Sequence, residues 1–234
     1  MTISHTQLKW EEQTVSGENC ISTTDIHIHP LNNGVIIINV PGVGGSCDGY
    51  QSKYVKLADF LIQNSLGAVV RMGDPYNPFG WDRNLRQVMA YVLDNSEKIC
   101  QSEKPNIYLM GTSAGAGAVS LLAWEYPEVK RMLLLEPAAP SDRSNLKDAL
   151  GRYTGEIVVV TGSPGISLGK DVGQIFTDFC TNTTKRELVE LTDCDHHFSG
   201  EKNGRILSQA PLYAFSKNPP TVFPDYEGGV ALYK

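Results

Sequence analysis

The stretch that decides the fold reads Leu109-Met110-Gly111-Thr112-Ser113-Ala114-Gly115-Ala116-Gly117-Ala118. It centres a Gly-x-Ser-x-Gly pentapeptide on Ser113, with an apolar segment before it (106–110) and a small-residue helix after it (114–125). A strand, a sharp turn and a helix in this order are typical of a nucleophile elbow, which presents a serine on a strained backbone. Glycines two residues away on each side leave room for the turn, where larger side chains would clash.

The composition is that of an ordinary globular chain. Its 234 residues suffice for one α/β domain and are too few for two, so we expect a single domain over 1–234. Hydrophobic residues make up 41% and charged residues 20%, and the net charge of −6 argues against nucleic acid as a partner. The five cysteines are scattered, which indicates free thiols. No apolar run is long enough to cross a bilayer, and the first residues lack the apolar centre of a secretory signal peptide. We therefore expect a cytoplasmic protein without a membrane partner, and the oligomeric state stays open.

Short apolar runs alternate with helical patterns along most of the chain, which predicts an α/β fold with a mostly parallel sheet and helices on both faces. Two alternating strands within residues 1–33 predict an antiparallel edge. The tail from 217 to 234 is rich in proline and glycine, and we expect it to be irregular. We expect the strands at 8–15, 23–29, 35–40, 68–72, 106–110, 130–135, 156–161 and 186–192, and the helices at 49–64, 82–100, 114–125, 171–180 and 204–215.

Chemically reactive side chains follow several of the expected strands. Ser113 follows one, Glu136 follows the next, and a segment with two histidines (193–198) follows the last. Ligands gather at the carboxyl ends of parallel strands. The sequence therefore predicts that a serine, a carboxylate and a histidine converge on one edge of the sheet.

From about Val35 to Phe215 the chain resembles the α/β-hydrolase family in its order of strands, helices and motifs. The resemblance implies that Ser113 is the nucleophile and that a histidine of Asp195-His196-His197-Phe198 is the base. We favour His196, and His197 is the alternative register. The resemblance also implies an oxyanion hole made by the backbone N–H groups of Val43 and Ala114.

The acid is the point at which this chain departs from the family. The family's usual position follows the fifth buried strand, and that stretch here, 161–165, contains no carboxylate. Some members, including certain haloalkane dehalogenases, carry the acid one strand earlier, where this chain has Glu136. A carboxylate directly after three leucines would be costly to bury unpaired, and a histidine partner would relieve that cost. Glu136 is therefore the first candidate, Asp171 the second and Asp142 the third.

Loops at the same edge are candidates for substrate binding. We expect Gly42 and Gly44, in a glycine-rich loop after the first buried strand, and Tyr76 and Trp81, in an aromatic loop, to line the pocket; the aromatic residues could equally pack their own loop. The glycine-rich loop is not followed by the lysine of a phosphate-binding P-loop.

Metal or cofactor binding is not expected. His27 and His29 share one face of an early strand, which can bind metal, but neither they nor the segment 193–197 has a recognised zinc spacing.

These patterns together predict a serine hydrolase that cleaves an ester or thioester of a small-molecule acyl substrate. The short segment between the strands at 130–135 and 156–161 leaves no room for a large cap domain, so the site should be open. A peptidase or acyltransferase on the same fold is the enzymatic alternative. A catalytically silent protein that binds a ligand or partner is the other alternative, because the usual acid position is empty.

Overall fold

One mixed sheet forms the centre of the molecule. The computed structural model describes residues 2–14, 16–74, 81–163, 167–218, 220 and 230–233. Within these residues nine strands form a sheet in the order β1-β2-β4-β3-β5-β6-β7-β8-β9. Strands β3 to β8 run parallel, whereas β1, β2 and β9 pair in antiparallel fashion. The strands are β1 (Ser4–Gln13), β2 (Asn19–His29), β3 (Val35–Val40), β4 (Ala68–Met72), β5 (Asn106–Thr112), β6 (Val129–Leu135), β7 (Glu156–Thr161), β8 (Lys185–Leu191) and β9 (Val230–Tyr233).

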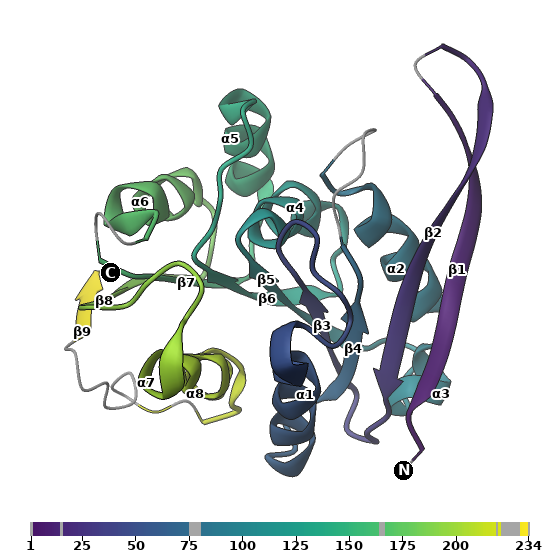
Figure 1. The fold of residues 1–234 in the computed structure, drawn as a ribbon, viewed down its shortest axis with the longest axis horizontal. Helices are drawn as coiled ribbons and strands as arrows, with labels where there is room; N and C mark the ends of the chain where they lie inside the picture. The colour runs from purple at the N-terminus through teal and green to yellow at the C-terminus, as the bar shows by residue number, and fades with distance from the viewer. Residues whose placement is uncertain are drawn as a thin grey trace.

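Helices cover both faces of the sheet (Figure 1). Helices α2 to α6 pack on one face, and α1 and α8, with α7 beside α8, lie on the other. The helices are η1 (Tyr50–Ser52), α1 (Lys53–Gln63), α2 (Arg83–Asp94), α3 (Ser96–Cys100), α4 (Ala114–Leu122), η2 (Ala123–Glu125), α5 (Arg143–Arg152), α6 (Gly169–Phe179), α7 (Gly200–Gly204) and α8 (Ile206–Phe215). None of the described helices combines the length and the apolar character that crossing a bilayer requires.

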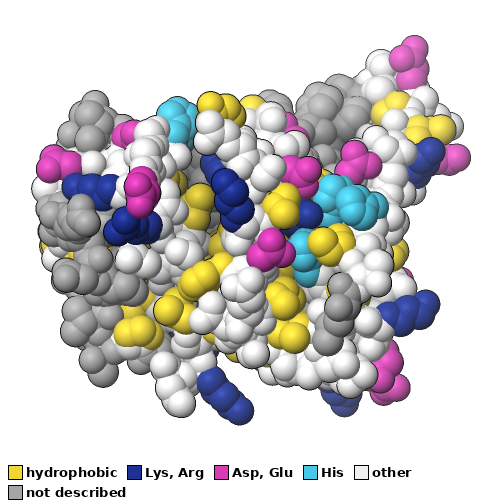
Figure 2. Space-filling model, turned by 60° about the horizontal axis from the view of Figure 1, so that its bottom comes forward, with side chains coloured by type: hydrophobic (Ala, Val, Ile, Leu, Met, Phe, Trp, Pro, Cys, Tyr) yellow, Lys and Arg dark blue, Asp and Glu magenta, His cyan; other side chains and the backbone are white. Residues whose placement is uncertain are grey.

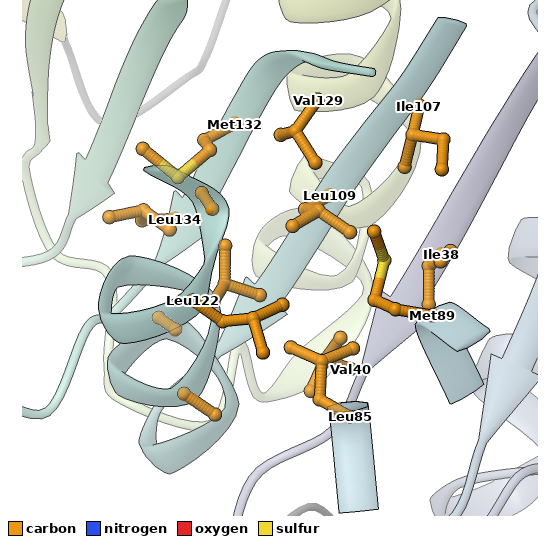
Figure 3. Close-up of a cluster of buried hydrophobic side chains, with 14 of the residues drawn as sticks. Ile38, Val40, Leu85, Met89, Ile107, Leu109, Leu122, Val129, Met132 and Leu134 are labelled. Atoms are coloured by element: carbon orange, nitrogen blue, oxygen red, sulfur yellow. The ribbon is translucent and has the colours of Figure 1, made fainter. Parts of the chain in front are cut away.

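Each face of the sheet has its own hydrophobic core, because successive side chains of a strand point to opposite faces. On β3, Ile36, Ile38 and Val40 belong to the core under α2 to α6, and Ile37 belongs to the core under α1 and α8. Figure 3 shows part of the first core, built by side chains of β3, β5, β6, α2 and α4. Burial on both faces explains why the central strands read as continuous apolar runs.

Strand register aligns the ends of the central strands. Val40 of β3 lies opposite Gly111 of β5, and Thr112 of β5 lies opposite Leu135 of β6. Leu135 in turn lies opposite Val160 of β7. The loops that follow β3, β5, β6 and β7 therefore begin side by side at one edge of the sheet.

Several elements differ from the sequence expectation. Helix α7 was not expected, and the helix expected at 82–100 is divided at Asn95 into α2 and α3. Helix α5 was not expected, although Asp142 caps it by accepting hydrogen bonds from the backbone N–H groups of Ser144 and Asn145. A capping aspartate ahead of a helical apolar pattern was the signal that could have revealed it. The tail expected to be irregular contains β9 at its end, which pairs with residues 188–191 of β8. This pairing supplies partners for backbone groups on an otherwise open edge.

Candidate active site

Ser113 lies at the turn between β5 and α4, in a backbone conformation that non-glycine residues rarely adopt. Its φ of 54° and ψ of −118° place it outside both the helix and strand regions. Such strain persists only where the surroundings enforce it. Here the backbone of Ser113 is fixed on two sides, since its N–H donates to the carbonyl of Leu135 and its carbonyl accepts from Ala138. The serine is thereby held at the end of the sheet.

The two flanking glycines are required by close backbone approaches. A Cβ added at Gly111 would lie 2.5 Å from Cα of Ala116, and one added at Gly115 would collide with the carbonyl oxygens of Val40 and Pro41. The second approach brings the end of β3 directly against the elbow. The Gly-x-Ser-x-Gly pattern is therefore explained by packing in three dimensions as well as by the turn.

The ring of His196 lies between Ser113 and Glu136. Its Nε2 is 3.1 Å from Oγ of Ser113, and its Nδ1 is 3.1 Å from Oε2 of Glu136. A carboxylate can only accept a hydrogen bond, so it favours the tautomer with the proton on Nδ1. Nε2 is then free to accept the hydroxyl proton of the serine. The side chain of His196 is 25% exposed and that of Glu136 is 0% exposed, so a partly accessible imidazole contacts a fully buried carboxylate.

Glu136 is buried but well supplied with hydrogen bonds. It lies directly after β6 with a positive φ of 48°, and its own N–H donates to the carbonyl of Val160 on β7. Oε1 accepts from the backbone N–H of Gly162, and Oε2 accepts from that of Leu168 at 3.2 Å in addition to the ring of His196. Charge-assisted bonds of this kind offset the cost of burying a carboxylate.

The loop after β3 approaches the serine closely. A Cβ added at Gly42 would lie 3.2 Å from Cβ of Ser113. The loop is closed by a bond from Gly45 N–H to the carbonyl of Gly42, and it is anchored by Gly44 N–H, which donates to the carboxylate of Asp74 at 2.6 Å. Val43, at the tip, is 67% exposed. The loop is thus closed on itself and fixed to Asp74, which follows β4.

A cavity of about 540 Å³ opens over this arrangement. It is lined by residues of the β3 loop, the start of α1, the elbow and the histidine loop: Gly42, Val43, Gly44, Gly45, Ser46, Gly49, Tyr50, Lys53, Tyr54, Thr112, Ser113, His196, His197 and Phe198.

Known proteins resemble this chain in structure and not in sequence. No protein-family model and no curated protein sequence matches the chain. Among solved structures, the esterase domain of a Rhodothermus marinus protein is 16% identical, with a TM-score of 0.59 over 88% of this chain and 95% of that one. Dienelactone hydrolase from Anabaena variabilis is 17% identical, with a TM-score of 0.61 over 90% and 99%. Est1E from Butyrivibrio proteoclasticus is also 17% identical, with 0.61 over 86% and 96%.

The chain has the α/β-hydrolase fold. At these identities the likeness establishes the fold and leaves the activity to the site itself.

In this α/β-hydrolase fold the acid beside the histidine is Glu136, after β6. Asp171 lies in the first turn of α6, and Asp142 caps α5. In the described part of the chain, neither of these aspartates has a hydrogen bond or ion pair to His196. Of the three candidate acids, only Glu136 is therefore brought to the ring.

The choice between the two histidines is made by the turn that carries them. Asp195 accepts hydrogen bonds from the backbone N–H groups of His197 and Ser199, at 3.0 and 2.9 Å. These bonds lower the pKa of Asp195 against the opposing effect of its partial burial. The resulting turn directs His196 to Ser113, whereas His197 is exposed at the rim, with its ring edge-on to that of His196 at 5.3 Å.

Of the two aromatic residues expected to line the pocket from the loop after β4, the structure describes Trp81. Trp81 packs on α4, because a Cβ added at Gly117 would lie 2.8 Å from its ring. It is not among the residues that line the cavity over Ser113. Tyr76 lies outside the described residues. The packing of Trp81 favours a structural role for this end of the loop.

His27 and His29 contact an arginine. The buried Arg71 donates from Nε to Nε2 of His29 at 3.1 Å, and its Nη2 lies 3.2 Å from Nδ1 of His27. Burial lowers the pKa of both histidines, and the adjacent guanidinium lowers it further. Among the described residues no group of three or more His, Cys, Asp or Glu side chains is arranged to hold a metal ion.

Asp74 and Lys53 are among the residues at the site that the sequence did not indicate. Asp74 anchors the β3 loop through Gly44, and Lys53 lines the cavity from the start of α1. Lys53 carried a weak signal, because a basic residue at the first position of a helix opposes the helix dipole. Asp74 carried none, since its contact joins two loops 30 residues apart.

Proposed function

We propose that this chain is a serine hydrolase that cleaves an ester or thioester of a small molecule through an acyl-enzyme. The contact chain from Ser113 through His196 to Glu136 carries the proposal, because two successive hydrogen bonds join a hydroxyl, an imidazole and a carboxylate in the order that nucleophilic catalysis requires. Further support comes from the neighbouring structures, which include esterases and a dienelactone hydrolase.

The reaction begins with attack of Ser113 Oγ on the carbonyl carbon while Nε2 of His196 takes the hydroxyl proton. Glu136 holds the imidazole in the required tautomer and stabilises the imidazolium that forms. The carbonyl electron pair moves to oxygen, and the backbone N–H groups of Ala114 and Val43 bind the resulting oxyanion. Each such donor is typically worth about 3 kcal/mol of the barrier.

Collapse of this intermediate expels the alcohol or thiol, which takes the proton from His196. Water then attacks the acyl-enzyme, again with His196 as base, and the acid is released as Ser113 recovers its proton. The segment between β6 and β7 holds one ten-residue helix, α5, which favours a site without a large cap domain.

A catalytically silent binding protein was the alternative, on the ground that the usual acid position holds no carboxylate. The contact of Glu136 with His196 offers a carboxylate from another position and so supports the catalytic proposal over the silent one. Hydrolase and acyltransferase differ in the acceptor of the acyl group, so product analysis with and without an added alcohol separates them.

Labelling with a fluorophosphonate probe tests the proposal. We expect the wild type to label and Ser113→Ala to remain unlabelled while keeping its circular dichroism spectrum. The wild type should hydrolyse p-nitrophenyl acetate and methyl ferulate, and Ser113→Ala should hydrolyse neither. Methyl ferulate is chosen because Est1E has been crystallised with ferulic acid. Equal labelling of both proteins would refute Ser113 as the nucleophile.

A further inference from the structure

A second, larger cavity continues from the one over Ser113. It measures about 990 Å³ and lies between α1 and the α7–α8 segment. The two cavities share Tyr50, Lys53, His197 and Phe198 as lining residues. A substrate bound at Ser113 can therefore extend along this groove.

The groove has an apolar floor. Leu57 and Phe60 of α1 face it from one side, and Phe198 and Leu207 face it from the other. Figure 2, turned to bring the lower side of Figure 1 forward, shows hydrophobic side chains grouped on this side of the molecule, with charged ones among them. Such a lining suits the hydrocarbon part of an acyl or alcohol group.

Two lysines stand at this groove. Lys53 and Lys56 are the first and fourth residues of α1, and both line the larger cavity. Both oppose the helix dipole, and the first turn of α1 contains no acidic residue. Burial lowers the pKa of Lys53, and its Nζ lies 5.0 Å from the centre of the Tyr54 ring.

No carboxylate among the described residues forms an ion pair with either lysine. The one acidic residue in the lining of the larger cavity is Glu201, which already pairs with Arg205 at 2.8 Å. The groove thus holds positive charge that an anion would compensate.

We propose that Lys53, assisted by Lys56, binds an anionic group of the substrate, so that the enzyme prefers esters or thioesters that carry a carboxylate or phosphate as well as an apolar segment. This inference rests on the proposed hydrolase function and names its substrate class. A lysine that merely covers apolar surface with its stem would give no such preference.

Matched substrate pairs test the carboxylate arm. The p-nitrophenyl esters of hexanoate and hemiadipate differ by a terminal methyl against a carboxylate, and those of butyrate and hemisuccinate form a shorter pair. We expect the wild type to favour the charged member of at least one pair about tenfold in kcat/KM, mainly through KM. Added salt should reduce this ratio. A butyryl thioester of coenzyme A against one of N-acetylcysteamine tests the phosphate arm in the same way.

Substitutions of Lys53 test whether this side chain causes the preference for charged substrates. Lys53→Met should lower the charged-to-neutral ratio about tenfold, Lys53→Arg should keep most of it, and the exposed Lys98→Met in α3 serves as the control that leaves it unchanged. A wild type without preference in every pair, or a Lys53→Met variant with the wild-type ratio, would overturn the inference. Ser113-dependent hydrolysis of the neutral esters would then still stand, whereas loss of all turnover and labelling would defeat the proposed function itself.

Discussion

Replacing Glu136 by glutamine probes the site most sharply, because the change keeps the shape and removes only the charge and one acceptor. Oε1 accepts from Gly162 N–H, and Oε2 accepts from Leu168 N–H and the ring of His196. A glutamine has one carbonyl oxygen for these three donors. The amide NH2 must therefore face a donor in either orientation.

Each orientation has a cost that can be worked out. With the carbonyl toward Gly162, the NH2 faces His196, and the ring must turn to the tautomer whose Nε2 carries the proton and cannot accept from Ser113. With the carbonyl toward His196, the NH2 opposes the N–H of Gly162 in a site with 0% exposure. A lost charge-assisted bond of about 2–3 kcal/mol corresponds to roughly 10²-fold, and the unfavourable tautomer adds a similar factor. We expect kcat to fall about 10³–10⁴-fold.

The assay is steady-state hydrolysis of p-nitrophenyl acetate, with thermal unfolding to show that the variant folds. Asp171→Asn is the matched control, since Asp171, in the first turn of α6, has no hydrogen bond or ion pair to His196 among the described residues. It should change kcat by less than about twofold. A Glu136→Gln enzyme within tenfold of the wild type, or a larger loss in Asp171→Asn, would refute the assignment of the acid.

Three further predictions follow from the same contacts. His196→Ala should abolish esterase turnover while His197→Ala retains most of it, and equal losses would mean that both rings serve the reaction. Gly115→Ala should destabilise the protein by ~1–3 kcal/mol in chemical denaturation, because the added Cβ would collide with backbone oxygens. Gly151→Ala in α5, whose added Cβ would make only ordinary contacts at 3.8 and 3.9 Å, should not destabilise it, and equal stabilities of the two variants would contradict the packing. Burial lowers the pKa of His29, so the unfolded state binds its proton first as pH falls below about 6.5, and stability should decline from there down to the folded pKa. His29→Gln should flatten that slope by up to about 1.4 kcal/mol per pH unit in urea titrations between pH 7.5 and 5.5, and an unchanged slope would exclude His29 as its source.

The sequence by itself determined the elements whose causes are local. The strand, turn and helix around Ser113 could be predicted because the apolar run, the glycines and the small residues are contiguous in the chain. The central strands could be predicted because burial on both faces requires uninterrupted apolar runs. Short elements without a strong local pattern, such as β9, depended instead on a neighbouring strand edge, which no local pattern reveals.

The tertiary structure alone decided which side chains meet. The sequence left three carboxylates as candidate partners of the histidine. The alignment of β6 with β7 places Glu136 beside the ring, and backbone N–H groups distant in the sequence donate hydrogen bonds to its carboxylate. The sequence also left two adjacent histidines as candidate partners of Ser113, and the turn around Asp195 places His196 next to it. Lys53 lines the same cavity because the start of α1 lies beside the β3 loop and the histidine loop. Contacts of this kind join residues distant in sequence, so their geometry is set by the packing of the sheet and its helices and cannot be read from spacing along the chain.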